Sequence, residues 1–281
     1  MRLVGAVTHA GGQINEDGWG MVGSADDVSA AWVLDGVTGI NARNYLPGET
    51  DAAWFVGRAN LHLQSLAALN ISINEILSLL VERLIEDWNA VSGQIEFPAD
   101  YDPPASCLTF IKRYGSLWHV VQLGDCSLLV QNADGTIEIA MDQDHDSISN
   151  ALATRAKELR MRGSVDIKQL LAEFKPQLLA QRKSRNTAGG LSILKAHQAA
   201  VQFANYWQFM NLAKILLCTD GFYRAVDCYG LYSNDGLLKA SAKSVERVLA
   251  EVRKVESGDP DCQRFVRLKA SDDATAIVFS I

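Results

Sequence analysis

The sequence predicts an α+β fold, a four-layer α/β/β/α sandwich of two antiparallel sheets flanked by helix pairs. The first indication is the order of the segments, in which strand-like runs alternate with groups of helical patterns along the whole chain. The second is hydrophobic spacing. Short β-branched and apolar runs are typical of strands, whereas apolar residues three and four positions apart are typical of helices. Neither an internal repeat nor a linker interrupts the pattern, so a single domain over residues 1–281 is expected.

The N-terminal part is expected to contain two strands and a helix pair. Apolar runs at residues 2–8 and 28–34 predict strands on either side of a loop rich in glycine and acidic residues. Residues 51–68 and 72–91 have helical spacing, and Ser72 begins a capping box at the start of the second helix. The two helices should be antiparallel and lie on a sheet.

The rest of the chain is expected to alternate strands and helices. A proline-rich loop at 92–104 precedes an antiparallel meander. The expected meander comprises residues 106–113, 116–123, 126–131 and 136–140. A polar stretch at 142–190 carries two helical patterns, about 147–161 and 166–182. The remaining expected elements are strands at 191–195, 200–209, 213–218 and 275–279 and a helix at 241–256.

Composition restricts the class of protein. No run of about 18 apolar residues is present and the N-terminus lacks the pattern of a secretory signal, so a cytoplasmic protein without a membrane span is expected. The five cysteines show no CxxC spacing, which argues against a disulfide framework or a zinc knuckle. A formal net charge of -7 argues against nucleic acid as the main partner.

Aspartates stand at the ends of the expected strands. Three apolar runs each end in an aspartate next to a glycine: Asp35, Asp125 and Asp220. Asp17 and the pair Asp272-Asp273, just before the last expected strand, lie in two further acidic loops. A carboxylate at a strand end can reach a shared cleft at the rim of a sheet, and an adjacent glycine lets the backbone turn sharply there. A single Asp-Gly is most often a turn, so it is the joint placement that indicates a site.

The charge of such a site indicates its chemistry. Clustered carboxylates without basic partners repel one another unless a cation holds them together. Ligation by oxygen alone favours Mg²⁺, Mn²⁺ or Ca²⁺ over Zn²⁺, which usually recruits histidine or cysteine. Mg²⁺ and Mn²⁺ are the better suited to reactions of phosphate. The sequence therefore predicts a site for a hard divalent cation.

Eight short motifs follow one another along nearly the whole chain. They are Asn15-Glu16-Asp17, Asp35-Gly36-Val37-Thr38-Gly39, Ser106-Cys107-Leu108-Thr109, Gly124-Asp125-Cys126-Ser127, Asp144-His145-Asp146, Arg185-Asn186-Thr187-Ala188-Gly189-Gly190, Thr219-Asp220-Gly221 and Asp272-Asp273-Ala274-Thr275. In this order they resemble the motifs of the protein phosphatase 2C family, the metal-dependent protein phosphatases, in its bacterial form. The resemblance implies hydrolysis of phosphoserine and phosphothreonine in proteins that a serine/threonine kinase has modified. It also implies a substrate-facing flap at about 142–190.

Carried over residue by residue, the resemblance implies two Mg²⁺ or Mn²⁺ ions per chain and a third, weaker site. The implied metal positions are Asp17, Asp35, Gly36, Asp125, Asp220 and Asp272. Asp35 would bridge two ions and Asp220 would complete the second site, so these two are the expected catalytic residues, whereas Asp273 would be structural. Water activated by two ions would attack phosphorus directly. Neither Cys107 nor Cys126 is therefore expected to be a nucleophile.

Three positions depart from the family pattern, and one of them is Ser127, where the family's GDSR motif has an arginine. Many members carry an arginine that grips the substrate phosphate at the position of Gly12, and some have a histidine at the position of Val37. His9, close before the acidic loop, is a candidate contact for the substrate phosphate, with a hydrogen-bonded strand-end histidine as the alternative. A basic run at 182–185 lies in the flap segment, where it could select phosphopeptides.

Two other functions remain open. The glycine at position 12 favours a catalytically silent module that binds a phosphoprotein or partner without hydrolysis. The third hypothesis is a phosphatase of the same fold that acts on a small phosphoester. Hydrolysis of a phosphopeptide relative to a small aryl phosphate separates the first function from the third.

Overall fold

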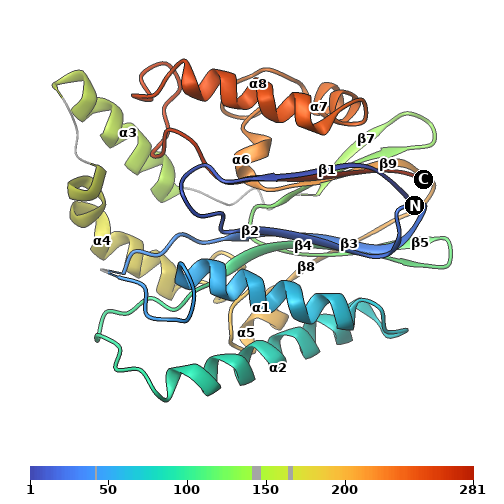
Figure 1. Ribbon diagram of the computed structural model, residues 1–281, viewed down its shortest axis with the longest axis horizontal. Coiled ribbons are helices and arrows are strands. Elements are labelled where there is room, and N and C mark those ends of the chain that lie inside the picture. Colours follow the sequence, from blue (N-terminus) through green and yellow to red (C-terminus); the bar gives the residue numbers. More distant parts are fainter. Residues whose placement is uncertain (42, 141–146, 164–166) are drawn as a thin grey trace.

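Two antiparallel sheets of five strands each pack face to face in the computed structural model, which describes residues 1–41, 43–140, 147–163 and 167–281 (Figure 1). The first sheet has the order β1 (Arg2–His9), β10 (Ala274–Ser280), β9 (Leu212–Cys218), β6 (Ser127–Asn132) and β7 (Ile137–Ala140). The second has the order β2 (Asp17–Ser24), β3 (Asp27–Gly36), β4 (Ser106–Tyr114), β5 (Leu117–Leu123) and β8 (Asn205–Phe209). The predicted α+β sandwich of two antiparallel sheets is confirmed.

Alternation along the central strands builds three apolar layers. In β3, Val33 faces the core between the sheets, whereas Trp32 packs on the opposite side under helices. In β10, Phe279 faces the central core and Val278 packs under the other helices. All four side chains are fully buried, and burying an apolar side chain of this size contributes about 1.5–3 kcal/mol. Burial on both faces explains why these strands read as nearly continuous apolar runs.

A helix pair covers the outer face of each sheet (Figure 1). Helices α1 (Asp51–Leu66) and α2 (Ile73–Ser92) cover the second sheet, and α7 (Asn234–Ser241) and α8 (Val245–Ser257) cover the first, beside the short α6 (Asp220–Tyr223). The predicted capping box of α2 is present. The Ser72 hydroxyl accepts the N–H of Glu75 at 3.2 Å, and the Glu75 carboxylate accepts the N–H of Ser72 at 2.9 Å.

Helices α3 (Ser147–Met161) and α4 (Ile167–Lys183) lie at the end of the sandwich opposite the chain termini (Figure 1). Leu178 of α4 and Ala156 of α3 are buried together, with Ile40 and Leu268 packed against them. These two helices therefore dock on loops that leave both sheets. No helix in the described ranges is long and apolar enough to cross a membrane.

The structure corrects the sequence interpretation at the first acidic loop. The segment expected to be a loop between the first two strands contains β2, which pairs with β3 from Asp17 to Ser24. Glycines in β2 hid its strand pattern, and one of them is required by packing. A Cβ atom at Gly20 would lie 2.3 Å from the ring of Trp32, so the ring occupies the space of the missing side chain.

The expected meander is also corrected. Strands β4 and β5 belong to the second sheet, whereas β6 and β7 belong to the first, so the chain changes sheets at residues 124–126. Gly124 makes this crossover in the left-handed region, with φ of 82°. The apolar alternation is the same on both sides of the crossover, which is why it read as one meander.

Three later predictions also differ from the structure. Residues 191–195 form only a single bridge, between Ser106 and Leu194, in place of a strand. The strand expected at 200–209 is divided into the short helix α5 (Ala199–Gln202) and β8. The helix expected at 241–256 begins only at Val245, because the Ser244 hydroxyl caps the start of α8. A separate helix, α7, precedes it.

Candidate active site

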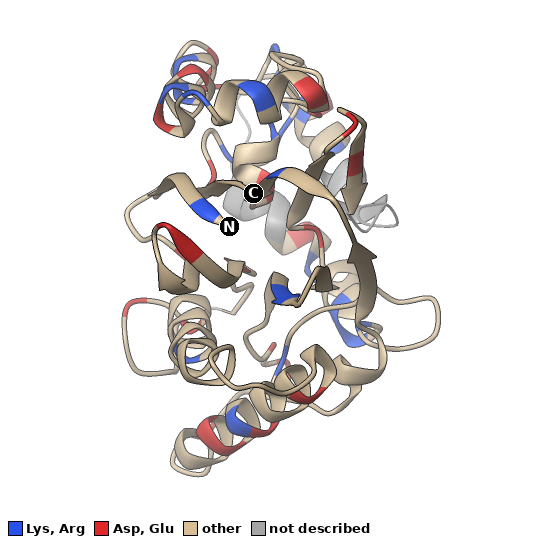
Figure 2. Cartoon of the chain, turned by 90° about the vertical axis from the view of Figure 1, so that its right-hand side faces the viewer, with Lys and Arg blue, Asp and Glu red and all other residues tan. Residues whose placement is uncertain are grey.

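The outer helices carry both signs of charge. In the view of Figure 2, lysines and arginines are interspersed with acidic residues along the helices. On α8, for example, Arg247 pairs with Glu251 and Arg253 pairs with Glu256. Both signs of charge also occur at the strand ends at one end of the sandwich, where several aspartates come together.

Carboxylates from both sheets meet at one end of the sandwich. Asp17 opens β2 and is the register partner of Asp35, near the end of β3. Asp220 follows β9 and Asp272 precedes β10, and these strands are neighbours in the first sheet. Asp125 lies in the crossover between the sheets. The fold thus brings together aspartates that are far apart in the sequence.

A cleft of about 370 Å³ opens at this end of the sandwich. Its lining includes Asp35, Gly36, Asp125, Asp220, Asp272, Leu178, Arg182 and Arg185. The first five are predicted metal positions, and the last three belong to α4 and the loop after it. The sixth predicted position, Asp17, is not among the described lining residues. The acidic strand ends and the α4 segment therefore face one another across the cleft.

Two glycines beside the aspartates allow backbone segments to touch. A Cβ atom at Gly36 would lie 2.5 Å from the carbonyl oxygen of Glu16, and one at Gly221 would lie 1.9 Å from the carbonyl oxygen of Asp273. Real Cβ atoms do not approach carbonyl oxygens this closely. The glycines next to Asp35 and Asp220 are thus needed for close packing of the loops that carry the carboxylates.

Burial and mutual repulsion raise the pKa values of the central carboxyl groups. Burial raises the pKa of Asp35 well above its ordinary value, with further contributions from the charges of Asp220 and Asp17. Burial likewise raises the pKa of Asp17 well above the ordinary value. Burial and the neighbouring Asp272 raise the pKa of Asp220 to about 6. The three half-buried side chains form an acidic cluster whose charges oppose one another.

One oxygen of this cluster has no hydrogen-bond partner among the residues that the structure describes. The Thr219 hydroxyl donates to Oδ2 of Asp17 at 2.8 Å. The other oxygen of Asp17, Oδ1, is buried and accepts no hydrogen bond from any described residue. A buried carboxylate oxygen normally has a partner, so this one indicates a place for a cation or a polar ligand.

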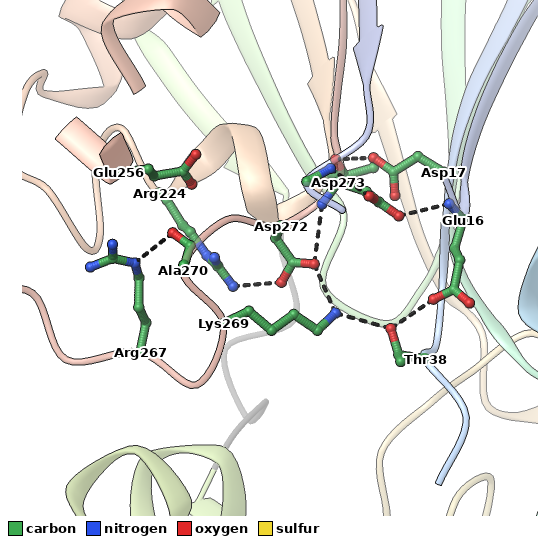
Figure 3. Close-up of polar contacts among 12 residues, drawn as sticks. Glu16, Asp17, Thr38, Arg224, Glu256, Arg267, Lys269, Ala270, Asp272 and Asp273 are labelled. Carbon is green, nitrogen blue, oxygen red and sulfur yellow. Dashed lines mark hydrogen bonds and ion pairs between the residues drawn. The ribbon is translucent and has the colours of Figure 1, made fainter. Parts of the chain in front are cut away.

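Asp272 differs from the other carboxylates, because each of its oxygens is bound by a cation. Arg224 donates to Oδ2 at 2.6 Å and Lys269 donates to Oδ1 at 2.9 Å (Figure 3). Although burial acts in the opposite direction, Lys269 and Arg224 hold the pKa of Asp272 below its ordinary value. Asp272 is therefore an ion-paired carboxylate at the edge of the cluster.

Asp273 ties the last acidic loop to the first. Its carboxylate accepts the backbone N–H groups of Gly11 and Glu16, both at 2.7 Å (Figure 3). These bonds use both carboxylate oxygens of Asp273 and hold the loop before β2 against the loop before β10. The contacts agree with the structural role expected for this residue.

Two arginines of the α4 segment line the cleft, and they differ in their hydrogen bonds and ion pairs. Arg182 forms an ion pair with Asp102 and donates to the carbonyl oxygen of Thr38 at 2.9 Å. The side chain of Arg185 makes no hydrogen bond or ion pair with any described residue. Burial, and then the charge of Arg182, lower the pKa of Arg185 to about 10, so the guanidinium remains protonated at neutral pH. Arg185 therefore lines the cleft as a cation that makes no hydrogen bond or ion pair within the described part of the chain.

Asn186 fixes the loop that carries Arg185. Its amide donates to the carbonyl oxygen of Ile193 at 2.9 Å and accepts the N–H of Ile193 at 2.8 Å. Asn186 itself adopts a φ of 55°, in the left-handed region that asparagine tolerates. The loop from 186 to 193 is closed by its own side chain, which fixes the backbone next to Arg185.

Other candidates from the sequence lie outside this arrangement. His9, at the end of β1, is exposed and is not among the described residues lining the cleft, so its placement gives no support to a substrate contact. Cys107 lines the cleft, but burial raises its pKa and that of Cys126, which keeps both thiols protonated. The motif Asp144-His145-Asp146 falls outside the described residues.

Sequence reasoning missed the two cations bound to Asp272. Arg224 lies four residues after Asp220, the spacing that places two side chains on one face of a helical turn. Lys269 lies three residues before Asp272. Both spacings were visible in the sequence, but neither indicates by itself which carboxylate a cation will reach.

The predicted metal positions fit a divalent cation in part. Asp17, Asp35 and Asp220 fit in their chemistry, because they are oxygen donors that repel one another and one of their oxygens lacks a partner. Asp272 fits less well, since both its oxygens are ion-paired. Within the described ranges, no three side chains of His, Cys, Asp or Glu converge as a finished metal site.

Comparison with known proteins identifies the family. The model of the protein phosphatase 2C family matches residues 4–259, and the chain therefore belongs to this family. Membership confirms the expected enzyme class, the protein-serine/threonine phosphatases. No curated protein matches the sequence significantly.

Solved structures of bacterial phosphatases share the fold. The serine/threonine phosphatase PstP/Ppp of Mycobacterium tuberculosis is 15% identical, with a TM-score of 0.56 and coverage of 99% of this chain and 97% of that one. Stp1 of Staphylococcus aureus is 13% identical, with a TM-score of 0.56 and coverage of 99% and 94%. The catalytic domain of PstP in complex with two manganese ions is 15% identical, with a TM-score of 0.51 and coverage of 98% and 95%. At these identities the likeness establishes the fold alone.

Proposed function

We propose that this chain hydrolyses phosphoserine and phosphothreonine in proteins and that it uses two Mg²⁺ or Mn²⁺ ions, with a third, weaker site at Asp125. The observation that carries the proposal is the half-buried acidic cluster of Asp17, Asp35 and Asp220, which is assembled from both sheets. One of its oxygens has no partner among the described residues. The two manganese ions in the complex of the PstP catalytic domain support the choice of metal.

Several residues of the chain would bind the metal ions together. Asp35 and Asp220 would hold the ions, and Gly36 would contribute its carbonyl oxygen. Asp17 would contribute its carboxylate from β2, the strand that pairs with β3. When bound, the ions supply a water of lowered pKa as nucleophile and neutralise the charge of the phosphoryl group. Because Cys107 is kept protonated, the proposal includes no covalent step on the protein.

Arg185 would take over the phosphate contact that Gly12 cannot make. It is a protonated guanidinium on the cleft wall, it is unpaired among the described residues, and it belongs to a loop closed by Asn186. An arginine fork matches the geometry of phosphate oxygens. The residues from about 142 to 190 would form a flap that faces the substrate, within one catalytic domain over 1–281.

The proposal also concerns cellular context. The substrates would be phosphoproteins made by a serine/threonine kinase, and the location would be the cytoplasm. All five cysteines are free, which suits a reducing compartment.

A second function is favoured by a specific observation. Both oxygens of Asp272 are occupied by Lys269 and Arg224, which favours a module that binds phosphoproteins without hydrolysing them. In such a module the lysine and arginine would replace metal charge permanently.

The test is hydrolysis of a phosphothreonine peptide with and without Mn²⁺. Wild type would be compared with Asp35→Asn, Asp220→Asn and the exposed control Asp26→Asn, and a small aryl phosphate would be the second substrate. We expect Mn²⁺-dependent release of phosphate that is lost in the first two variants only.

Other outcomes decide against the proposal in different ways. Binding of the peptide without release at any Mn²⁺ concentration would leave the silent module. Release from the aryl phosphate alone would indicate a phosphatase for small phosphoesters.

A further inference from the structure

The two cations on Asp272 differ in how firmly they are held. The Arg224 side chain is 15% exposed, lies in the first turn after Asp220 and interacts electrostatically with that carboxylate as well. The Lys269 side chain is 46% exposed and reaches Asp272 on a flexible stem. Arg224 is therefore a fixed partner of Oδ2, whereas Lys269 can leave Oδ1 and enter solvent.

Lys269 also connects the two sheets at the cleft. Its ammonium donates to Oδ1 of Asp272, in the loop before β10, and to the Thr38 hydroxyl, in the loop after β3, at 3.0 Å (Figure 3). The Thr38 hydroxyl in turn donates to Glu16 at 2.7 Å. The ammonium is thus a compact positive charge held by oxygen atoms of both loops, which is also what a divalent cation between these loops would be.

The rest of the cluster shows why such a charge is needed. Burial and the charges of neighbouring aspartates raise the pKa values of Asp35 and Asp17. Asp272 alone has a lowered pKa, for which Lys269 is the largest favourable cause. Lys269 therefore neutralises part of the charge of Asp272, whereas no lysine or arginine in the described ranges donates a hydrogen bond to Asp17, Asp35 or Asp220.

We propose that Lys269 is an internal counter-ion that competes with the second divalent cation for Oδ1 of Asp272. The first cation binds at Asp17, Asp35 and Asp220, where no described ammonium or guanidinium has to leave a hydrogen bond to a carboxylate. The second must displace the ammonium of Lys269, so its affinity is lower. This inference rests on the proposed use of metal ions and specifies how the chain's own residues set their number and affinity.

The size of the effect follows from the lost ion pair. A partly exposed ion pair is weak, and removing it also removes the repulsion between the ammonium and the incoming ion. We expect replacement of Lys269 by glutamine to tighten the second site about tenfold. The first site should change by less than about twofold, because the hydrogen bonds of Lys269 go to Asp272 and Thr38 and its charge acts on Asp220 and Asp35 only at longer range.

The experiment is a Mn²⁺ titration of the full chain at neutral pH, with free Mn²⁺ measured by electron paramagnetic resonance. This readout counts bound ions without requiring turnover. Lys269→Gln is compared with wild type, with Lys269→Arg, which retains the competing charge, and with Lys243→Gln, an exposed lysine on the loop between α7 and α8. Circular dichroism establishes that each variant is folded.

We expect one tight and one weak Mn²⁺ site in wild type, in Lys269→Arg and in Lys243→Gln, and a tighter second site in Lys269→Gln alone. Unchanged binding in Lys269→Gln would overturn the inference and leave the metal-dependent function intact. Weaker binding in that variant would also overturn it, because Lys269 would then position Asp272 for the ion. Absence of Mn²⁺ binding in every variant would refute the metal-dependent function together with the inference.

Discussion

Replacing Asp220 by asparagine removes one negative charge from the acidic cluster and should stabilise the metal-free protein. Burial and Asp272 raise the pKa of Asp220 from an ordinary 3.8 to about 6. This rise corresponds to about 3 kcal/mol at about 1.36 kcal/mol per pKa unit. The ionised Asp220 therefore destabilises the fold by up to about 3 kcal/mol at neutral pH, and asparagine relieves this cost while retaining the shape of the side chain.

The sign of the pH dependence follows from the raised pKa. The folded protein holds the Asp220 proton more tightly than the unfolded chain, so wild type gains stability as the pH falls. The advantage of Asp220→Asn should be complete above about pH 6 and should disappear below about pH 4, the window between the folded and ordinary values. Comparing the two proteins at each pH removes the contributions of other titrating groups.

The assay is thermal unfolding in the presence of a chelator, at a series of pH values. At neutral pH the gain would raise the melting temperature by about 5–10 °C. With Mn²⁺ in place of the chelator the order should reverse, because ligand binding stabilises only the protein that binds the ion well. Asp26→Asn, at an exposed position, should match wild type throughout. If Asp220→Asn is no more stable than wild type with chelator at neutral pH, the reasoning about a repulsive buried cluster is refuted.

Three further predictions concern other contacts. Arg185→Gln should raise the KM for a phosphothreonine peptide about tenfold and leave the exposed control Lys183→Gln unchanged, in steady-state kinetics; equal KM values would rule out Arg185 as the phosphate contact. Ser72→Ala should cost about 1 kcal/mol in urea unfolding, because the N-cap of α2 is lost, and an unaltered midpoint would contradict the cap. Asp259→Ala should cost about 3–5 kcal/mol, because Arg267, only 4% exposed, loses its partner at 2.6 Å; a cost below about 1 kcal/mol would show that water replaces that partner.

The sequence predicted correctly those features for which a local pattern has a single physical interpretation. Asp35 and Asp220 were predicted correctly at strand ends, because an apolar run that stops at Asp-Gly must turn at the rim of a sheet. The capping box at Ser72 was likewise predictable, since its bonds join residues three positions apart.

The features that the sequence did not predict depend mostly on contacts between segments that are distant in the sequence. Gly20 hid a strand, because the space that it leaves is filled by Trp32 from the next strand. The change of sheet at Gly124 leaves the apolar alternation intact, so the crossover looked like a hairpin. Arg224 pairs with Asp272 across 48 positions, which no local spacing encodes. Lys269 pairs with Asp272 across three positions, but that spacing does not by itself indicate which carboxylate a cation will reach.

The contact of Gly36 with Glu16, and of Gly221 with Asp273, has a consequence for how this sequence can vary. These glycines contribute no functional group, yet even a methyl group would collide with a backbone oxygen at 2.5 Å and 1.9 Å, respectively. In a library of all single substitutions, both positions should therefore tolerate as little change as the aspartates beside them. The tolerated sequences around the site would then record the steric fit of the loops as much as the chemistry of the carboxylates.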